Sequence, residues 1–251
     1  MQVLALLLLG LSPPAGAQER VAVGGGLHRR FYPSSEGRTE VQVAPFTMDA
    51  TPVTVARYQA FVQAHPTWQK GAPKALFADA GYLASWAGPA DPGSLDRQRP
   101  VTELSWFAAR AYCQAQGGDL PTVDQWEHAA DATADAPTGA RSDPQTLQRV
   151  LAWYGEGPGV GLRPVAQEPP NHWGLYDMVG LVWEWTVDFN SLLIAADVRE
   201  SGEGEDLRFC GAGAVSATDV EDYASFMRFA MRSSMQASYT THNVGFRCVY
   251  P

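Results

Sequence analysis

The spacing of apolar residues predicts a strand followed by a helix near the start of the chain. Residues 40–48, EVQVAPFTM, alternate between polar and apolar side chains, which is typical of a half-buried β-strand. Residues 50–66 then change to helical spacing, and Thr54 is a plausible N-cap. The apolar residues on one face of this helix are Val55, Tyr58, Phe61 and Val62.

Two further helices are predicted before the middle of the chain. One starts after Ser105, carries Cys113, and ends at the pair Gly117-Gly118, because glycine takes the left-handed backbone that helix C-termini favour. The next begins at Thr122 and Gln125, whose spacing is that of a capping box. From about residue 155 onward, short apolar pieces are divided by Gly, Pro and Asn, which predicts short strands and turns.

Composition narrows the fold class. The chain has 251 residues with 45% hydrophobic residues, eight Trp, 24 Gly and 18 Pro, so it can bury a large core while spending much of its length in turns. No segment resembles an interdomain linker, and no internal repeat is evident. These features favour one compact, loop-rich domain over a helical bundle.

The N-terminus has the pattern of a secretory signal. Val3 to Leu11 is an apolar run too short to span a bilayer, and the small residues of 15–17 follow it as a cleavage pattern. No basic residue precedes the run, so either the N-terminal amine supplies the positive charge or the true start lies upstream. We expect a signal peptide over residues 1–17 and a mature domain over 18–251, secreted or periplasmic, with no transmembrane segment.

Charge and motif spacing exclude several functions. The formal net charge of −9 argues against a nucleic-acid partner. Residues 155–161, GEGPGVG, contain Pro158 and lack phosphate-loop spacing, which predicts a plain loop. The five histidines show no metal-binding pairing, and the acidic residues 200–206 lack the spacing of a calcium loop.

Four ordered blocks carry a resemblance to a known family. They are FTMDATPVTVARYQAFV, RPVTELSWFAARAYCQAQGGDLPTVDQWEHAA, GLYDMVGLVWEWTVDF and RSSMQASYTTHNVGFRC. In this order they resemble the formylglycine-generating enzyme, or sulfatase-modifying factor, family. The resemblance implies an α+β fold: a single loop-rich domain of the formylglycine-generating-enzyme type, related to the C-type lectin fold, with long loops building the binding face.

The same resemblance implies that the catalytic residues are missing. The family enzymes oxidise a sulfatase cysteine to formylglycine, using two cysteines that hold copper(I), a soft ion that prefers sulfur ligands. That pair stands thirteen and eight residues before an arginine matched here by Arg232. Asp219 and Ala224 occupy these two positions, and no cysteine lies between Cys210 and Cys248.

The remaining cysteines and the calcium loops follow from the resemblance as well. Cys113 and Cys248 match a structural disulfide of the family, the alternative being two buried free thiols, and Cys210 is then unpaired. Where the family has calcium-binding asparagines, this chain offers only aliphatic side chains, which argues against calcium. The positions concerned are Leu151, Ala152 and Leu181. Three carboxylates remain near the second loop, as structural anchors or as ligands: Asp177, Glu184 and Asp188.

Two functions stay open. The first is an exported accessory or binding protein for a protein or peptide partner, similar to the cysteine-poor members linked to copper nitrite reductases and to copper delivery. Its expected binding residues are Trp183, Trp185 and Arg232. The second is a divergent oxidoreductase with a copper site rebuilt around Cys210. The further ligand candidates for that site are Met227, Met231 and His242.

The two methionines have an ordinary alternative role. Met227, Phe229 and Met231 are expected on one side of a strand, with Arg228 and Arg232 pointing the other way. Such a stripe is either a core face or part of a sulfur ligand set. A partly exposed Cys210 thiolate near these side chains would favour the metal, and a Cys210 sealed in aliphatic side chains would favour the scaffold.

Overall fold

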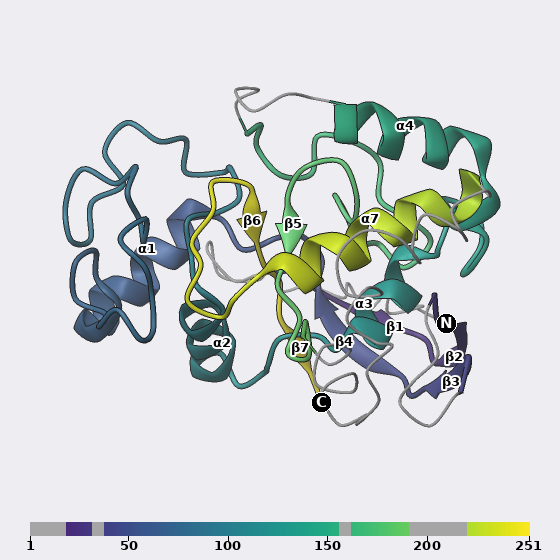
Figure 1. Ribbon diagram of the computed structural model, residues 1–251, viewed down its shortest axis with the longest axis horizontal. Coiled ribbons are helices and arrows are strands. Elements are labelled where there is room, and N and C mark those ends of the chain that lie inside the picture. Colours follow the sequence, from purple (N-terminus) through teal and green to yellow (C-terminus); the bar gives the residue numbers. More distant parts are fainter. Residues whose placement is uncertain (1–18, 32–37, 156–161, 191–219) are drawn as a thin grey trace, which may run out of the picture.

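The computed structural model describes residues 19–31, 38–155, 162–190 and 220–251 (Figure 1). Its strands are β1 (Arg20–Val23), β2 (Gly26–Arg29), β3 (Glu40–Val43), β4 (Phe46–Asp49), β5 (Trp183–Glu184), β6 (Val244–Gly245) and β7 (Val249–Tyr250). The largest sheet has the order β1-β4-β7 and is antiparallel. Strands from opposite ends of the described chain thus flank β4, in a loop-rich α+β domain.

Seven helical segments accompany these strands within the described ranges. They are α1 (Val55–Ala64), η1 (Pro66–Trp68), α2 (Trp106–Ala115), α3 (Val123–Ala130), η2 (Ala140–Ser142), α4 (Pro144–Gly155) and α7 (Val220–Ser234). Figure 1 shows α1 and α2 on one side of the sheets, with α4 and the first turns of α7 on the other. No helix of the described residues is both long and apolar enough to cross a membrane.

The three helices predicted from the sequence are confirmed, and local interactions fix their ends. The buried residues of α1 are Val55, Tyr58, Phe61 and Val62. Ser105 caps α2 by accepting a hydrogen bond from Ala108 N at 3.2 Å, and Gly117 follows the helix with φ +81°. Thr122 and Gln125 form the expected capping box of α3. Thr54 is the N-cap of α1, although its hydroxyl makes no capping hydrogen bond.

Two predictions about strands are wrong. Residues 40–48 do not form one strand, because the chain leaves β3 at Ala44-Pro45 and enters β4 at Phe46. The two strands belong to different sheets: β3 pairs with β2, and β4 pairs with β1 and β7. Proline has no N–H to donate, so Pro45 suits the break between them.

The stripe of Met227, Phe229 and Met231 is also not a strand, since residues 220–234 form the helix α7. On a helix the side chains of residues i and i+4 share a face. Met227 and Met231 therefore share one face of α7, and Arg228 and Arg232 share another. α4 was missed as well, although its start carries a helix signature. Asp143 accepts a hydrogen bond from Thr146 N at 2.8 Å, and proline is the first helical residue.

Two apolar clusters hold the elements together. The larger cluster joins α1, α2 and the C-terminal residues, and it contains Trp185, Phe246 and both disulfide cysteines. The smaller one packs Trp126 of α3 against β1, β3 and β4. Cys113 and Cys248 form a disulfide, with Cα atoms 5.4 Å apart and a sequence separation of 135. This bond fixes α2 to the end of the chain.

Asp49 is a fully buried carboxylate at the end of β4. It accepts hydrogen bonds from Cys248 N at 3.0 Å and from the Tyr250 hydroxyl at 3.1 Å. Burial raises the pKa of Asp49 from 3.8 to about 6, although these hydrogen bonds and Arg247 oppose the increase. The folded protein therefore holds this proton more tightly than the unfolded chain does.

The raised pKa predicts a pH dependence of stability. Protonated Asp49 stabilises the fold fully below pH 3.8, and this contribution, about 3 kcal/mol, is lost as the pH rises through about 6. We expect Asp49→Asn to remove that loss, so the free energy of unfolding should vary less between about pH 4 and pH 6 than in the wild type. Urea unfolding across this pH range tests it. The exposed Asp135→Asn serves as control, and equal slopes for all three proteins would contradict the assignment.

Candidate functional site

Ala224, which the sequence predicts at the position of the second family cysteine, lies on α7. Ala224 is 8% exposed, and its carbonyl oxygen accepts a hydrogen bond from the Tyr154 hydroxyl of α4 at 3.0 Å. Asp219, at the position of the first cysteine, lies outside the described residues. A cavity of about 30 Å³ adjoins Ala224, enough for about one water molecule. The site is therefore packed around an alanine methyl group.

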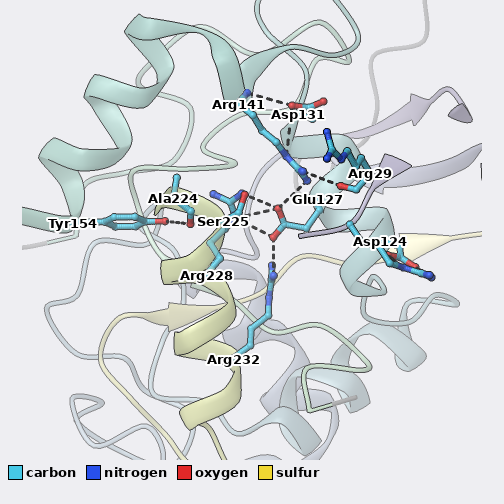
Figure 2. A network of polar contacts seen from close by, with 11 residues as sticks. Arg29, Asp124, Glu127, Asp131, Arg141, Tyr154, Ala224, Ser225, Arg228 and Arg232 are labelled. Atoms are coloured by element: carbon cyan, nitrogen blue, oxygen red, sulfur yellow. Dashed lines mark hydrogen bonds and ion pairs between the residues drawn. The ribbon is translucent and has the colours of Figure 1, made fainter. Parts of the chain in front are cut away.

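One helical turn after Ala224, a buried carboxylate joins two arginines of α7 (Figure 2). Arg228 donates to Glu127 of α3 in a bidentate arrangement, with Nε–Oε1 at 2.9 Å and Nη2–Oε2 at 2.8 Å. Arg232 donates through Nη1 to Oε1 at 2.7 Å. Arg228 also donates to Ser225 Oγ at 3.1 Å. We call Glu127, Arg141, Arg228 and Arg232 the α3–α7 cluster, because it fastens one helix to the other.

The charges of the α3–α7 cluster fix its protonation state. Burial favours a neutral Glu127, but Arg228 and Arg232 outweigh it and hold the pKa of Glu127 well below its ordinary value. Burial likewise opposes the charge of Arg228, yet Glu127 raises the pKa of that guanidinium above its ordinary value. Glu127 thus stays ionised at neutral pH, which suits a structural clamp and not a proton-transferring group.

Further groups surround the cluster. Arg141 places Nη2 3.8 Å from Glu127 Oε2 and Nε 3.9 Å from Asp131 Oδ1. Burial, and next Arg141, lower the pKa of the nearby His28 to about 4, so this imidazole is neutral at physiological pH. Arg232 Nε is buried without a hydrogen-bond partner among the described residues. Three guanidinium groups therefore face two carboxylates here.

The expected binding residues separate into different environments. Trp183 is half-buried and stacks on Tyr154, with ring centroids 5.2 Å apart. A gap of about 10 Å³ brings Trp183 together with Met231 and Arg232. Trp185 instead lies in the larger core cluster, 2% exposed, and its indole donates to Leu104 O at 3.0 Å. Trp183 and Arg232 thus line the same gap, whereas Trp185 is part of the larger core cluster.

The metal candidates are spread along the chain. Met227 and Met231 lie one turn apart on α7, whereas His242 is an exposed residue of the loop before β6. Cys210 lies outside the described residues, as do Pro158 and the acidic residues 200–206. In the described part of the chain, no group of three or more His, Cys, Asp or Glu side chains is arranged to hold a metal ion.

The three remaining carboxylates all have structural partners. Glu184 and Arg247 form a fully buried ion pair, with Oε2 and Nε 2.9 Å apart, and Trp126 donates to Glu184 Oε2 at 2.8 Å. Arg247 also donates to the carbonyls of Asp49, Ala50 and Tyr176. The VWEW and GFRC blocks thus each supply half of one buried anchor.

Asp177 and Asp188 complete this set of anchors. Asp177 pairs with Arg163 at 2.9 Å and accepts a hydrogen bond from Ala166 N at 2.7 Å. Asp188 accepts a hydrogen bond from Val123 N at 2.8 Å, at the first residue of α3. Each carboxylate thus joins segments that lie apart in the sequence.

The comparisons with known proteins agree with this architecture. The Sulfatase-modifying factor enzyme 1-like domain family matches residues 12–251, and the chain belongs to this family. It is 31% identical to the inactive C-alpha-formylglycine-generating enzyme 2 of Bos taurus, over 91% of this chain and 86% of that protein. It is 29% identical to the formylglycine-generating enzyme of Mycobacterium tuberculosis, over 92% and 97% of the two chains.

Two solved structures are also similar to this chain. The crystal structure of CarF has a TM-score of 0.49 and 19% identity to this chain, covering 94% of this chain and 98% of that one. The structure of PvdO from Pseudomonas aeruginosa has a TM-score of 0.49 and 16% identity, covering 93% and 94%.

Proposed function

We propose that this chain is a non-catalytic member of its family and binds a protein or peptide partner. The observation that carries the proposal is Ala224. The family resemblance implies a thiolate at this position, whereas Ala224 has a methyl group. Tyr154 and the α3–α7 cluster pack around Ala224. A methyl group cannot coordinate copper(I). The similarity to a relative named inactive supports a family fold that persists without the activity.

We also propose that the protein is exported. The leader pattern of residues 1–17 supports this, and so does the disulfide between Cys113 and Cys248, because such bonds persist in oxidising compartments. The exported domain would act as an accessory protein in the maturation of a copper enzyme. The resemblance to the cysteine-poor members linked to copper nitrite reductases supports that role, and its partner would then be an exported protein.

The absence of oxidase activity is directly testable. The purified mature protein, with and without copper(I) and in the presence of oxygen, is expected to leave a sulfatase-type Cys-x-Pro-x-Arg peptide unchanged. The reason is that Asp219 and Ala224 supply no soft sulfur ligand to activate oxygen. Mass spectrometry after hydrazide labelling measures the aldehyde. The formylglycine-generating enzyme of Streptomyces coelicolor, a relative at 32% identity, is the positive control.

Two outcomes would contradict the proposal. The first is aldehyde formation above the control without protein. The second is tight one-to-one copper(I) binding, measured against a competing chelator, that is lost in Cys210→Ser. That result would support the divergent oxidoreductase with Cys210 and a sulfur or imidazole ligand, because a hydroxyl is a poor ligand for copper(I). Met227→Leu and Met231→Leu would then identify the remaining ligands.

A further inference from the structure

A cleft of about 870 Å³ opens between α2 and the segment that follows α1. Its described lining includes Lys74, Phe77, Trp106, Phe107, Arg110 and Gln114. Its volume lies toward the upper end of the range of about 300–1,000 Å³ that is usual for ligand sites. It shares no residue with the α3–α7 cluster, and Figure 1 shows α2 well separated from α4.

Aromatic rings with fixed orientations form the apolar part of the cleft. The Trp106 indole donates to Thr186 O at 3.0 Å, which holds the ring in place. Phe107 contacts Trp106 and Phe77 edge to face, with centroids 5.3 Å apart in both pairs. At the rim, Phe77 is 39% exposed and the adjacent Leu76 is 73% exposed. These rings are pre-organised to bind an apolar side chain, because they would lose little conformational freedom on binding.

The charge of the cleft is opposite to that of the whole protein. Lys74 and Arg110 are the ionisable residues among the described residues that line it, and no carboxylate lines it with them. Arg110 is held by Asp119 in a bidentate ion pair at 2.9 Å. The ammonium of Lys74 has no ion-pair or side-chain hydrogen-bond partner within the described part of the chain. A protein with net charge −9 thus offers an unpaired cation beside an apolar surface.

We propose that this cleft binds a segment of the partner protein in which a large apolar side chain is flanked by acidic residues. The rings of Trp106, Phe107 and Phe77 would cover the apolar side chain. Lys74 would pair with a carboxylate, and the Gln114 amide at the end of α2 offers a further hydrogen bond. The proposal rests on the proposed function, which requires a protein or peptide partner.

Charge complementarity favours an acidic segment over a basic one. A basic peptide would place its cations beside Lys74, with no carboxylate in the described lining to receive them. The length of the lining, from η1 to the last turn of α2, suits several consecutive residues of an extended chain. Because the cleft shares no lining residue with the cavity beside Ala224, it would serve recognition without any oxidase chemistry.

Binding is measured by calorimetry with three terminally blocked peptides and the full mature protein. The first is Asp-Phe-Glu-Leu-Asp, the second has lysine in place of each acidic residue, and the third has serine in place of both apolar residues. We expect the first peptide to bind with a dissociation constant below about 1 mM and at least about tenfold more tightly than either other peptide. Added salt should weaken its binding.

Two exposed residues provide variants that keep the fold. Lys74→Glu and Phe77→Ser are each expected to weaken binding of the first peptide at least about tenfold, because they reverse the charge or remove part of the wall. Arg149→Glu is the matched control, since it makes the same charge change at a 57% exposed side chain on α4. It should leave the affinity unchanged within about twofold. Circular dichroism confirms that each variant is folded.

Three results would overturn the assignment of the cleft. They are no binding of the acidic peptide at about 1 mM, equal binding of the lysine peptide, or equal affinity in the wild type and both cleft variants. These results leave the proposed function standing, because that is tested by aldehyde formation and copper(I) binding. A protein that bound the acidic peptide and also formed the aldehyde would keep the cleft and lose the non-catalytic assignment.

Discussion

Glu127→Ala is expected to lower the free energy of unfolding by about 3–5 kcal/mol, the largest effect of any single substitution proposed for this chain. Glu127 is buried and accepts hydrogen bonds from Arg228 and Arg232. Its removal leaves two guanidinium groups of α7 buried without their carboxylate. Urea unfolding at pH 7 measures the loss. The free energy of unfolding of Glu127→Gln should lie between those of the wild type and Glu127→Ala, because the amide oxygen still accepts a hydrogen bond.

An exposed carboxylate supplies the control for this experiment. Glu168 pairs with Arg149 and Arg163 at 3.5 and 3.7 Å, with its side chain 53% exposed. Glu168→Ala should cost no more than about 1 kcal/mol, because solvent screens such pairs. Similar losses for Glu127→Ala and Glu168→Ala would mean that the α3–α7 cluster does not fasten α7 to α3.

Glu127 also sets the behaviour of the protein in acid. Since its folded pKa lies below the ordinary value of 4.5, the ionised carboxylate stabilises the fold above that pH. This contribution is lost as the pH falls below about 4.5, toward the folded pKa. The variant Glu127→Ala should therefore lose less stability than the wild type on acidification from pH 5 to pH 3. The sign is opposite to that of Asp49, whose contribution is lost as the pH rises.

The second large effect concerns the disulfide between Cys113 and Cys248. Replacing both cysteines with alanine is expected to lower the free energy of unfolding by about 2–5 kcal/mol. The bond closes a loop of 135 residues, so it restricts the unfolded chain strongly. Both cysteines are fully buried in the larger core cluster, and alanine avoids placing an unsatisfied hydroxyl there.

Peptide mapping without reductant accompanies this measurement. The mature wild type should yield one cross-linked pair of peptides, which contains Cys113 and Cys248. Cys210→Ala is the matched control and should retain that pair, because the third cysteine is expected to be unpaired. Recovery of Cys113 and Cys248 as free thiols, or of either joined to Cys210, would contradict the assignment.

The sequence predicted best those features that depend on neighbouring residues. The capping box of α3 needs only Thr122 and Gln125, and the start of α2 needs only Ser105 and the next turn. The start of α4 has a local signature of the same kind, because Asp143 precedes a proline at the first helical position. Contacts within four residues can be inferred from spacing because the helix itself sets their distance.

The prediction failed where two periods fit the same residues. Met227, Phe229 and Met231 satisfy a period of two, so they were assigned to a strand. Arg228 and Arg232 satisfy the helical spacing of four equally well, and the structure forms that helix. The deciding contact is Glu127, which lies 101 residues before Arg228 and accepts hydrogen bonds from both arginines. One carboxylate reaches both because a helix brings residues four apart to about 6 Å, whereas a strand would hold them about 13 Å apart. No local pattern contains that information.

The sequence alone determined the family blocks and the helices with local caps, because each depends on residue identity or short spacing. The tertiary structure alone decided which charges meet. Glu184 and Arg247 are 63 residues apart yet form one buried pair. Within the described residues, Lys74 remains without an ion-pair partner beside the rings of α2. The reason is physical: electrostatic and packing energies depend on distance in space and on burial, which only the folded chain fixes.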